Sequence, residues 1–425
     1  MKKTIYSLVL SSFLFGSSCT SPQVKNQEIQ LTNNSKIKLV DKPISIKRTQ
    51  LTVIDSTAIH PIVISGTDTI ASQVNASDND TAWDELFFVM DFAPEETKTI
   101  TIAWSKQLPK YPQRTSARFG KRASKDAPVK PKTHETMLAN ELPLSIGYQQ
   151  YQTDGPSWEN DKVGFRHYLD GRNAKDLFGK KTTAISPENV GISADGAVED
   201  NYHTMEDWGR DILAVGNSLG LGGFGLIKDS TLMRLGVTVN DTVNNVEETK
   251  FKILHEGPVN TTLQYKYTNW NTANGIYDVK ETTSIWLGMY GYQNTVTING
   301  LTGDENLVVG LVNIHNDMPL EVLKNNNKYV ILLTHDKQSY DKEWWLGMAI
   351  ILPKEKYLGY MEAPKTGNLS NSYLAILDIK DNEPVKYFAI AGWELSDEKF
   401  VDRNEFINYV LDMTDQLSVN IKITL

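Results

Sequence analysis

The sequence predicts an all-β protein built around one large antiparallel β-sandwich, with a single helix near its C-terminus. From about residue 160 onwards, short apolar or alternating runs recur between clusters of turn residues, as in proteins made of many strands. These runs do not alternate with helical segments, which argues against a parallel α/β sheet. Helical spacing is convincing only over residues 402–416, where Phe406, Val410 and Leu411 form one apolar stripe.

The composition is that of a globular protein, with 40% hydrophobic and 22% charged residues in a chain of 425. The formal net charge of −9 gives no general attraction to nucleic acid or to an anionic membrane surface. A single cysteine excludes a disulfide framework and a multi-thiolate metal site. His315 and Asp317 have the spacing of metal ligands but lack a third ligand nearby, so we expect no metal and no other cofactor.

The first 18 residues have the features of a secretory signal peptide. Lys2 and Lys3 precede an apolar stretch that is too short to span a bilayer, and small residues lead to Cys19. This run resembles the lipobox of bacterial lipoproteins, which implies lipid attachment at Cys19; an ordinary cleaved signal is the alternative. We expect residues 19–40 to be a tether, the lipid to be the only membrane contact, and the periplasmic face of the cell envelope to be favoured, because residues 20–27 carry no acid.

Residues 41–145 are predicted to form an N-terminal β-rich segment packed against a main sandwich domain, residues 146–425. Strand signals in the first part are the runs 61–64 and 86–90 and an alternating stretch at 100–104.

Within that segment, residues 110–132 are strongly basic. One acid, Asp126, stands against eight basic residues: Lys110, Arg114, Arg118, Lys121, Arg122, Lys125, Lys130 and Lys132. Such a segment is either a solvated loop or a clamp for an anionic ligand.

Residues 158–173 place a row of polar groups on one face of a predicted strand. A period of two puts Arg166, Tyr168 and Asp170 together and puts His167 on the apolar face, where a hydrogen-bonded core histidine is expected. An arginine can bind a carboxylate or sulfate through two hydrogen bonds, and a phenol can transfer a proton when a cation lowers its pKa. A surface ion-pair ladder is the structural alternative for this row.

Residues 201–211 combine a histidine, an arginine, three carboxylates and two aromatic rings. Aromatic faces stack on sugar rings, and histidine readily transfers protons at neutral pH. His203, Asp207, Trp208 and Arg210 are therefore candidate site residues, although a hydrogen-bonded structural loop explains the same composition.

Residues 216–220 read Gly-Asn-Ser-Leu-Gly, the G-x-S-x-G pattern of a nucleophilic serine. That pattern needs a helix directly afterwards, but three more glycines follow within five residues, and each disfavours a helix by about 1 kcal/mol. A glycine-rich turn into a strand is the better interpretation, with a Ser218 esterase as an alternative.

The residues around these motifs resemble a family of secreted bacterial lipoproteins from polysaccharide-utilisation loci, long filed as a domain of unknown function. The resemblance covers roughly residues 45–425 and is carried by Trp158–Asp161, Phe165–Asn173, Tyr202–His203 and Asp207–Gly220. It implies a supersandwich like that of mutarotase-type carbohydrate enzymes. The family pattern has an aliphatic residue where His167 stands, which agrees with an apolar position.

Some members of this family act as oligosaccharide dehydratases in the breakdown of ulvan, and they remove water from a terminal saturated uronic acid to leave a 4,5-unsaturated sugar. The resemblance implies this reaction, without a cofactor, on an anionic oligosaccharide. A polysaccharide lyase on the same glycans and a non-catalytic glycan-binding lipoprotein are further alternatives.

Elimination of water needs a base for the C5 proton, an acid for the C4 hydroxyl and a cation beside the C6 carboxylate. We expect Tyr168 and His203 to be the acid–base pair in unassigned order, and Arg166 or Arg210 to be the cation. Asp207 is expected to orient His203, and Trp208 to form a sugar platform. Arg172 and Trp158 complete the expected substrate-binding set.

Overall fold

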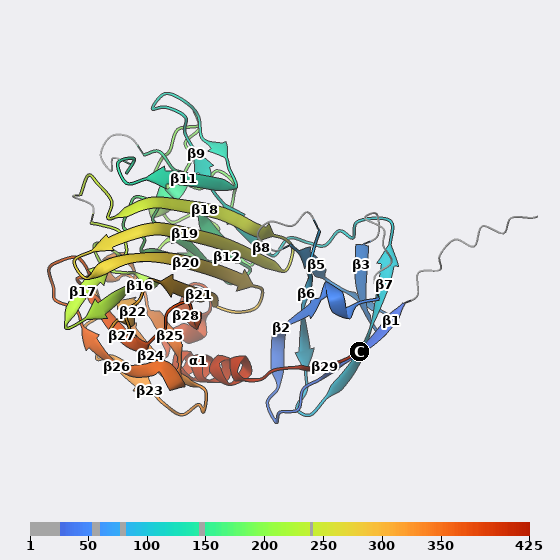
Figure 1. The fold of residues 1–425 in the computed structure, drawn as a ribbon. Coiled ribbons are helices and arrows are strands. Elements are labelled where there is room, and N and C mark those ends of the chain that lie inside the picture. Colours follow the sequence, from blue (N-terminus) through green and yellow to red (C-terminus); the bar gives the residue numbers. More distant parts are fainter. Residues whose placement is uncertain (1–25, 53–59, 77–81, 144–148, 239–240) are drawn as a thin grey trace, which may run out of the picture.

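The computed structural model describes residues 26–52, 60–76, 82–143, 149–238 and 241–425, which form two β-rich lobes (Figure 1). The predicted signal peptide and Cys19 lie outside the described residues. None of the described helices is long and apolar enough to cross a membrane.

The larger lobe is the predicted antiparallel β-sandwich, which is confirmed. One layer is a nine-stranded sheet (Figure 1), in the order β11 (His134–Leu138), β18 (Val246–Glu256), β19 (Asn260–Thr272), β20 (Gly275–Trp286), β21 (Gly291–Asn299), β28 (Val385–Trp393), β25 (Leu346–Pro353), β24 (Tyr329–Asp336) and β23 (Glu321–Leu323). Strands β18 to β21 follow one another in the chain. The other end of the sheet is formed by strands from the C-terminal third of the chain, β28, β25, β24 and β23.

Two five-stranded sheets form the opposite layer. The first has the order β15 (Gly209–Asp211), β14 (Lys175–Lys180), β13 (Val163–His167), β12 (Ser157–Asn160) and β8 (Thr115–Arg118). The second has the order β17 (Thr231–Arg234), β16 (Leu221–Lys228), β22 (Asn306–Val312), β27 (Ser372–Asp378) and β26 (Tyr357–Glu362). A parallel bridge between Lys175 and Gly220 joins these two sheets.

The core between the two layers is rich in aromatic side chains. Trp158 and Phe165 of the first five-stranded sheet pack on Tyr292 of the nine-stranded sheet, with ring centroids 5.4 Å and 4.7 Å from it. Each such ring buries a large apolar area, so this layer contributes much of the hydrophobic stabilisation of the lobe. A short hairpin, β9 (Gly120–Lys121) and β10 (Lys130–Pro131), extends from β8.

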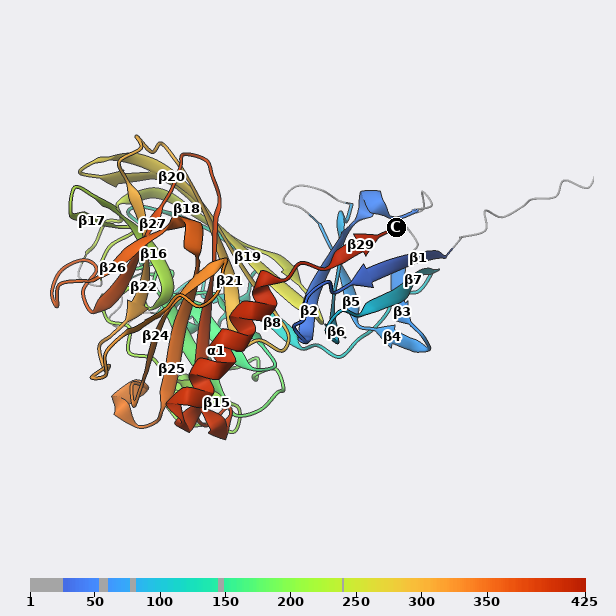
Figure 2. The same cartoon turned by 90° about the horizontal axis from the view of Figure 1, so that it is seen from below.

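The single helix, α1 (Arg403–Ser418), covers the outer face of the nine-stranded sheet (Figure 2). It begins at Asp402, whose carboxylate accepts hydrogen bonds from the backbone N–H groups of Asn404 and Glu405. Phe406 sits directly over Gly347 and Gly392, which pair across β25 and β28 and leave no room for larger side chains there. The predicted helix, with Phe406 and Val410 on its buried stripe, is confirmed.

The smaller lobe packs a three-stranded sheet, β2 (Leu39–Lys47), β6 (Glu85–Phe92) and β5 (Ser72–Asn75), on a five-stranded sheet. The latter has the order β29 (Lys422–Thr424), β1 (Gln27–Thr32), β7 (Thr97–Ser105), β3 (His60–Ser65) and β4 (Asp68–Ile70). The C-terminal strand therefore returns to pair with the first strand (Figure 2).

Two of the predicted boundaries differ from the structure. Residues 27–32 are a strand with Ile29 and Leu31 buried, so the predicted tether over 19–40 is wrong for this part. The expected segment 41–145 also divides between the lobes, because β8 and β11 belong to the main sandwich. The expected main domain, residues 146–425, divides as well, because β29 belongs to the small lobe. Polar residues such as Gln27 and Thr32 made the alternation of β1 difficult to recognise in the sequence.

Candidate functional site

The outer face of the sheet β15-β14-β13-β12-β8 is unusually polar. Arg118, Ser157, Arg166 and Asp176 lie opposite one another across four neighbouring strands, and directly paired residues share one face. The inner face of the same strands carries the apolar core. Residues 181–208, here called the cover segment, pack over the polar face through Val190, Tyr202 and Trp208 on Phe178.

Arg166 is the centre of an ionic cluster on this face. Its Nη2 lies 2.5 Å from Oδ2 of Asp176 and 2.7 Å from Oδ2 of Asp211, and only 2% of its side chain is exposed. Burial opposes the charge of Arg166, but neighbouring Tyr168 and the two carboxylates outweigh it and hold its pKa above the ordinary value. A guanidinium whose donors are already taken by carboxylates serves to position them, so the expected direct contact of Arg166 with substrate is not supported.

Tyr168 lies beside that guanidinium. Its hydroxyl accepts a hydrogen bond from Nη2 of Arg166 (2.6 Å) and donates one to Oδ2 of Asp176 (2.8 Å). Burial raises the pKa of Tyr168 well above its ordinary value, against the opposing effect of Arg166, so the phenol is protonated at neutral pH. Burial and Asp211 likewise raise the pKa of Asp176.

His203 connects the buried ionic cluster with the protein surface. Its Nε2 lies 3.3 Å from Oδ2 of Asp211, and 41% of its side chain is exposed. The hydrogen bond to Asp211 raises the pKa of His203, although burial opposes it. The ring of Tyr340 is stacked beside the imidazole at a centroid distance of 5.9 Å, and the ring of Tyr202 meets it edge to face at a centroid distance of 4.8 Å. These two rings hold the imidazole against the carboxylate.

Two further arginines flank the cluster. Arg172 stacks on the ring of Tyr168, 3.7 Å from its centroid, and pairs with Asp170 at 2.8 Å. Arg210 lies over Tyr340 and pairs with Glu343 at 3.2 Å. In the described part of the chain, neither Nη2 has a hydrogen-bond partner, so each arginine retains a donor for an anionic ligand.

The structure brings Arg166, Tyr168 and His203 together, but it places three other predicted residues differently. Asp207 is exposed and makes no contact with His203 in the described structure; Asp211 holds the imidazole instead. Trp208 is buried against Phe178 and cannot offer an open face to a sugar. Trp158 is 1% exposed inside the sandwich core, so its predicted substrate contact is wrong.

Two residues of this cluster, Asp176 and Tyr340, were not identified from the sequence. Asp176 lies in β14, Lys-Asp-Leu-Phe-Gly-Lys, where all six residues are buried and no alternation marks a strand. Tyr340 comes from the opposite end of the chain, beside Asp341 and Lys342, which both have positive φ. Asp211 differs from these two residues, because it is one of the three carboxylates that were noted in residues 201–211.

Ser218 is not placed as a nucleophile. It is 0% exposed, its hydroxyl donates to the carbonyl of Val215 (2.6 Å), and it accepts from the N–H of Gly220 (3.0 Å). No histidine contacts Ser218 among the described residues. It closes a turn after which β16 follows as a strand, so the esterase alternative is wrong.

Among the described residues, no three histidine, cysteine or carboxylate side chains are grouped to hold a metal ion.

A second polar network lies on the inner face of the same strands. Lys175 donates to Nδ1 of His167 (2.7 Å) and pairs with Glu281 at 2.8 Å, and all three side chains are buried. Burial lowers the pKa of His167 far below its ordinary value, and Lys175 lowers it further. His167 is thus a hydrogen-bonded core residue, as predicted, although its partners are ionic.

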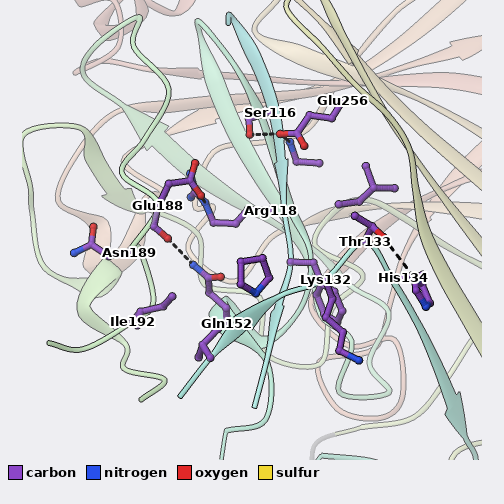
Figure 3. A pocket seen from close by; sticks show the side chains of 15 residues that line it. Ser116, Arg118, Lys132, Thr133, His134, Gln152, Glu188, Asn189, Ile192 and Glu256 are labelled. Atoms are coloured by element: carbon purple, nitrogen blue, oxygen red, sulfur yellow. Dashed lines mark hydrogen bonds and ion pairs between the residues drawn. The ribbon is translucent and has the colours of Figure 1, made fainter. Parts of the chain in front are cut away.

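A cavity of about 800 Å³ adjoins the outer face at its β8 edge (Figure 3). Its lining includes Arg118 of β8, Lys132 and His134 of the hairpin side, and Gln152, Glu188 and Glu256. None of the acid–base residues around His203 lines it.

These features define a large β-sandwich protein with an ionic cluster that reaches the surface at a histidine–carboxylate pair. The chain belongs to the family described as Domain of unknown function (DUF4861), whose profile matches residues 31–423. The uncharacterized protein P7 of Formosa agariphila is 24% identical over 293 residues, which are 64% of this chain and 68% of that protein.

Two solved structures from Enterococcus faecalis overlap with 94% of the chain at 10% identity and a TM-score of 0.48. One is a protein in the glycosyl hydrolase family 38 and the other is an alpha-mannosidase. The chain spans just under half of their lengths, 47% and 46%.

Proposed function

We propose that this protein is an oligosaccharide dehydratase, which removes water from a saturated uronic acid at the non-reducing end of an ulvan-type oligosaccharide and leaves a 4,5-unsaturated uronate. The observation that carries the proposal is the pair His203–Asp211, half open to solvent, beside a phenol that stays protonated and two arginines with a free donor. The resemblance of the 158–220 motifs to ulvan oligosaccharide dehydratases supplies the substrate class.

The roles are assigned from the contacts of each group, together with the direction in which its pKa is shifted. His203 accepts the C5 proton, and Asp211 stabilises the imidazolium that forms. The electron pair of the C–H bond becomes the C4–C5 double bond, and the C4 hydroxyl leaves as water with a proton from Tyr168. The Tyr168 hydroxyl must first turn away from Asp176, to which it donates in this structure. Arg166 stabilises the phenolate at 2.6 Å, which is its role in place of direct substrate binding.

The C6 carboxylate must be neutralised for charge to develop at C5. Arg210 and Arg172 flank the cluster and retain a donor each, so they are the candidates for this contact. Arg210 shares the neighbour Tyr340 with His203.

The test is mass spectrometry of defined oligosaccharides with a saturated terminal uronate, before and after incubation with the protein. A dehydratase lowers the mass by one water and generates the ultraviolet absorbance of a conjugated uronate, without shortening the chain. A shortened chain means a polysaccharide lyase, and an unchanged substrate that is nevertheless retained means a glycan-binding protein. Either result overturns the proposal.

We also propose a lipid anchor at Cys19 and a place in the bacterial cell envelope, with the periplasmic face favoured. Incorporation of labelled palmitate into the wild type, but not into Cys19→Ala, tests the anchor. Protease accessibility in intact cells tests the side of the outer membrane, and digestion there contradicts the periplasmic location.

A further inference from the structure

The cavity at the β8 edge has the features of a second ligand site. Its volume of about 800 Å³ lies in the range of small-molecule pockets. One part of the wall is apolar, with Phe119, Val129 and Ile192, and the rest supplies hydrogen-bonding groups from Gln152, Asn189 and Glu256 (Figure 3). Mixed walls of this kind suit a sugar, which presents both C–H faces and hydroxyls.

The charge beside the cavity favours an anion. Lys125, Lys130 and Lys132 of the hairpin are exposed, and none of them has a partner among the described residues. Other basic residues of the 110–132 segment are already paired: Lys121 with Glu135 at 2.7 Å, and Arg114 with Asp161. The two carboxylates of the lining are engaged, Glu256 by Ser116 (2.7 Å) and Glu188 by Arg118 (3.4 Å), so the unpaired ammonium groups beside the cavity remain to attract an anion.

The inner wall is fixed in place by hydrogen bonds. Arg118 donates to the carbonyl of Ser186 (2.9 Å) and to its hydroxyl (3.2 Å). Gln152 donates to the carbonyls of Glu188 (3.0 Å) and Val190 (2.7 Å). These bonds tie β8 and the turn at Gln152 to the cover segment, so the wall is preorganised for a ligand.

The cavity and the His203 cluster lie along the same face of the sheet, at its β8 and β15 edges, and the cover segment packs over the strands between them. Arg118 and Arg166 both pair with Ser157, so two strand spacings, roughly 10 Å, separate their backbones. The turn Gln152–Asp154 borders both sites, because Gln152 lines the cavity and Asp154 lies 3.8 Å from Arg166. Thr153 and Asp154 both have positive φ, a strained conformation in non-glycine residues.

The cover segment makes a second connection between the two sites. Asn201, two residues before His203, accepts a hydrogen bond from the N–H of Gly191 (2.8 Å) and donates to the carbonyl of Ile192 (3.1 Å). Ile192 lines the cavity.

We infer that this cavity binds the anionic sugar units that follow the reacting terminal uronate in the oligosaccharide chain. The inference rests on the proposed function for the identity of the ligand. It adds a second binding site at the other edge of the sheet, four strand spacings or roughly 20 Å from β15, whose Asp211 contacts His203. It also assigns Lys130 and Lys132 to substrate affinity for longer chains.

The test compares a charge-reversed double variant, Lys130→Glu/Lys132→Glu, with a matched control, Lys365→Glu/Lys380→Glu. The control lysines are also exposed and flank β27 in the other five-stranded sheet. The substrates are a uronate-terminated disaccharide and a sulfated hexasaccharide with the same terminus. We expect KM for the hexasaccharide to rise about tenfold, equivalent to about 1.4 kcal/mol, in the Lys130/Lys132 variant, with kcat unchanged. The disaccharide and the control variant are expected to behave as the wild type.

Two outcomes overturn the inference. The first is an unchanged KM for the hexasaccharide in the Lys130/Lys132 variant. The second is an equal increase for both substrates, because that places the effect at the reacting unit or in general electrostatics. Added salt should raise KM for the hexasaccharide in the wild type and much less in the variant.

Calorimetric binding of the hexasaccharide to His203→Gln separates this inference from the proposed function. If the hexasaccharide binds this variant through Lys130 and Lys132 and the wild type has no dehydratase activity, the site is supported and the reaction is overturned. If the wild type is an active dehydratase and hexasaccharide binding does not depend on Lys130 or Lys132, the reaction is supported and the site is overturned.

Discussion

The two faces of the strands β13 and β14 carry two ionic networks with opposite characters. Consecutive residues supply them: Arg166 and Asp176 point to the outer face, while His167 and Lys175 point into the sandwich core. The inner network, completed by Glu281, is buried among tyrosines. The outer network ends at His203, with 41% of its side chain exposed.

The difference shows in the two histidines. His203 keeps a carboxylate partner and solvent contact, so its pKa is raised and it can exchange protons with a ligand. His167 faces an ammonium and no solvent, so its pKa is lowered and it stays neutral. An ionic network on a sheet is thus available for chemistry only where the covering segment leaves an opening.

The largest expected effect comes from His203→Gln, which removes the group that joins the outer network to solvent. We expect kcat of the proposed elimination to fall by about 10²- to 10⁴-fold, because general acid–base catalysis contributes that much. The thermal midpoint should change little, since the imidazole is half exposed. His167→Leu is the matched control and should retain activity; equal losses in both variants would argue that neither face is specialised.

The next effect concerns the inner network. Lys175→Met leaves Glu281 as a buried carboxylate without its cation, and removing one partner of a buried pair costs about 3–5 kcal/mol. Lys356→Met is the control, because its partner Glu383 is exposed to solvent and ion pairs at the surface contribute little to stability. Urea unfolding measures both, and the double variant Lys175→Met/Glu281→Gln should recover part of the loss. Equal effects of the two single variants would contradict the comparison.

The sequence predicts the architecture better than the site, for physical reasons. Strands such as β20 and β21 alternate in burial because one face meets the core, and the helix over residues 403–418 shows its stripe at Phe406 and Val410. β14 gives no such signal, because the cover segment buries its outer face as well. A local pattern cannot report a face that is covered by a distant segment.

The same limit explains the errors within the candidate site. Spacing correctly placed Arg166 and His167 on opposite faces, and the 201–211 block correctly drew attention to His203. It could not show that Trp208 turns inwards onto Phe178, or that Asp211 rather than Asp207 meets the imidazole, because these contacts depend on how the cover segment folds onto the sheet.

A smaller effect is expected from Asp211→Asn, which weakens the link between His203 and the buried cluster. As the base, His203 must be neutral, so kcat/KM rises with pH through a pKa that Asp211 holds above about 6.5. The amide no longer stabilises the imidazolium, so the midpoint of the pH–rate profile should move to lower pH. NMR titration of the imidazole checks the assignment, and a midpoint that stays or rises would rule out this role for Asp211.

The smallest effect is a change of slope in the pH dependence of stability. His167 stays neutral in the folded state but takes up a proton below about pH 6.5 when unfolded, so it makes the wild type lose stability as the pH falls. The limiting slope for one such group is about 1.4 kcal/mol per pH unit. In His167→Leu this contribution is absent, while the other titrating groups remain.

The free energy of unfolding of the wild type should therefore fall relative to that of His167→Leu as the pH is lowered from 7 to 5, whatever offset the lost hydrogen bonds to Lys175 and Asn173 produce at pH 7. Urea titrations at several pH values measure the difference between the two proteins, in which contributions common to both cancel. Parallel curves would mean that His167 takes up its proton as readily in the folded protein as in the unfolded one, which contradicts the lowered pKa that its burial implies.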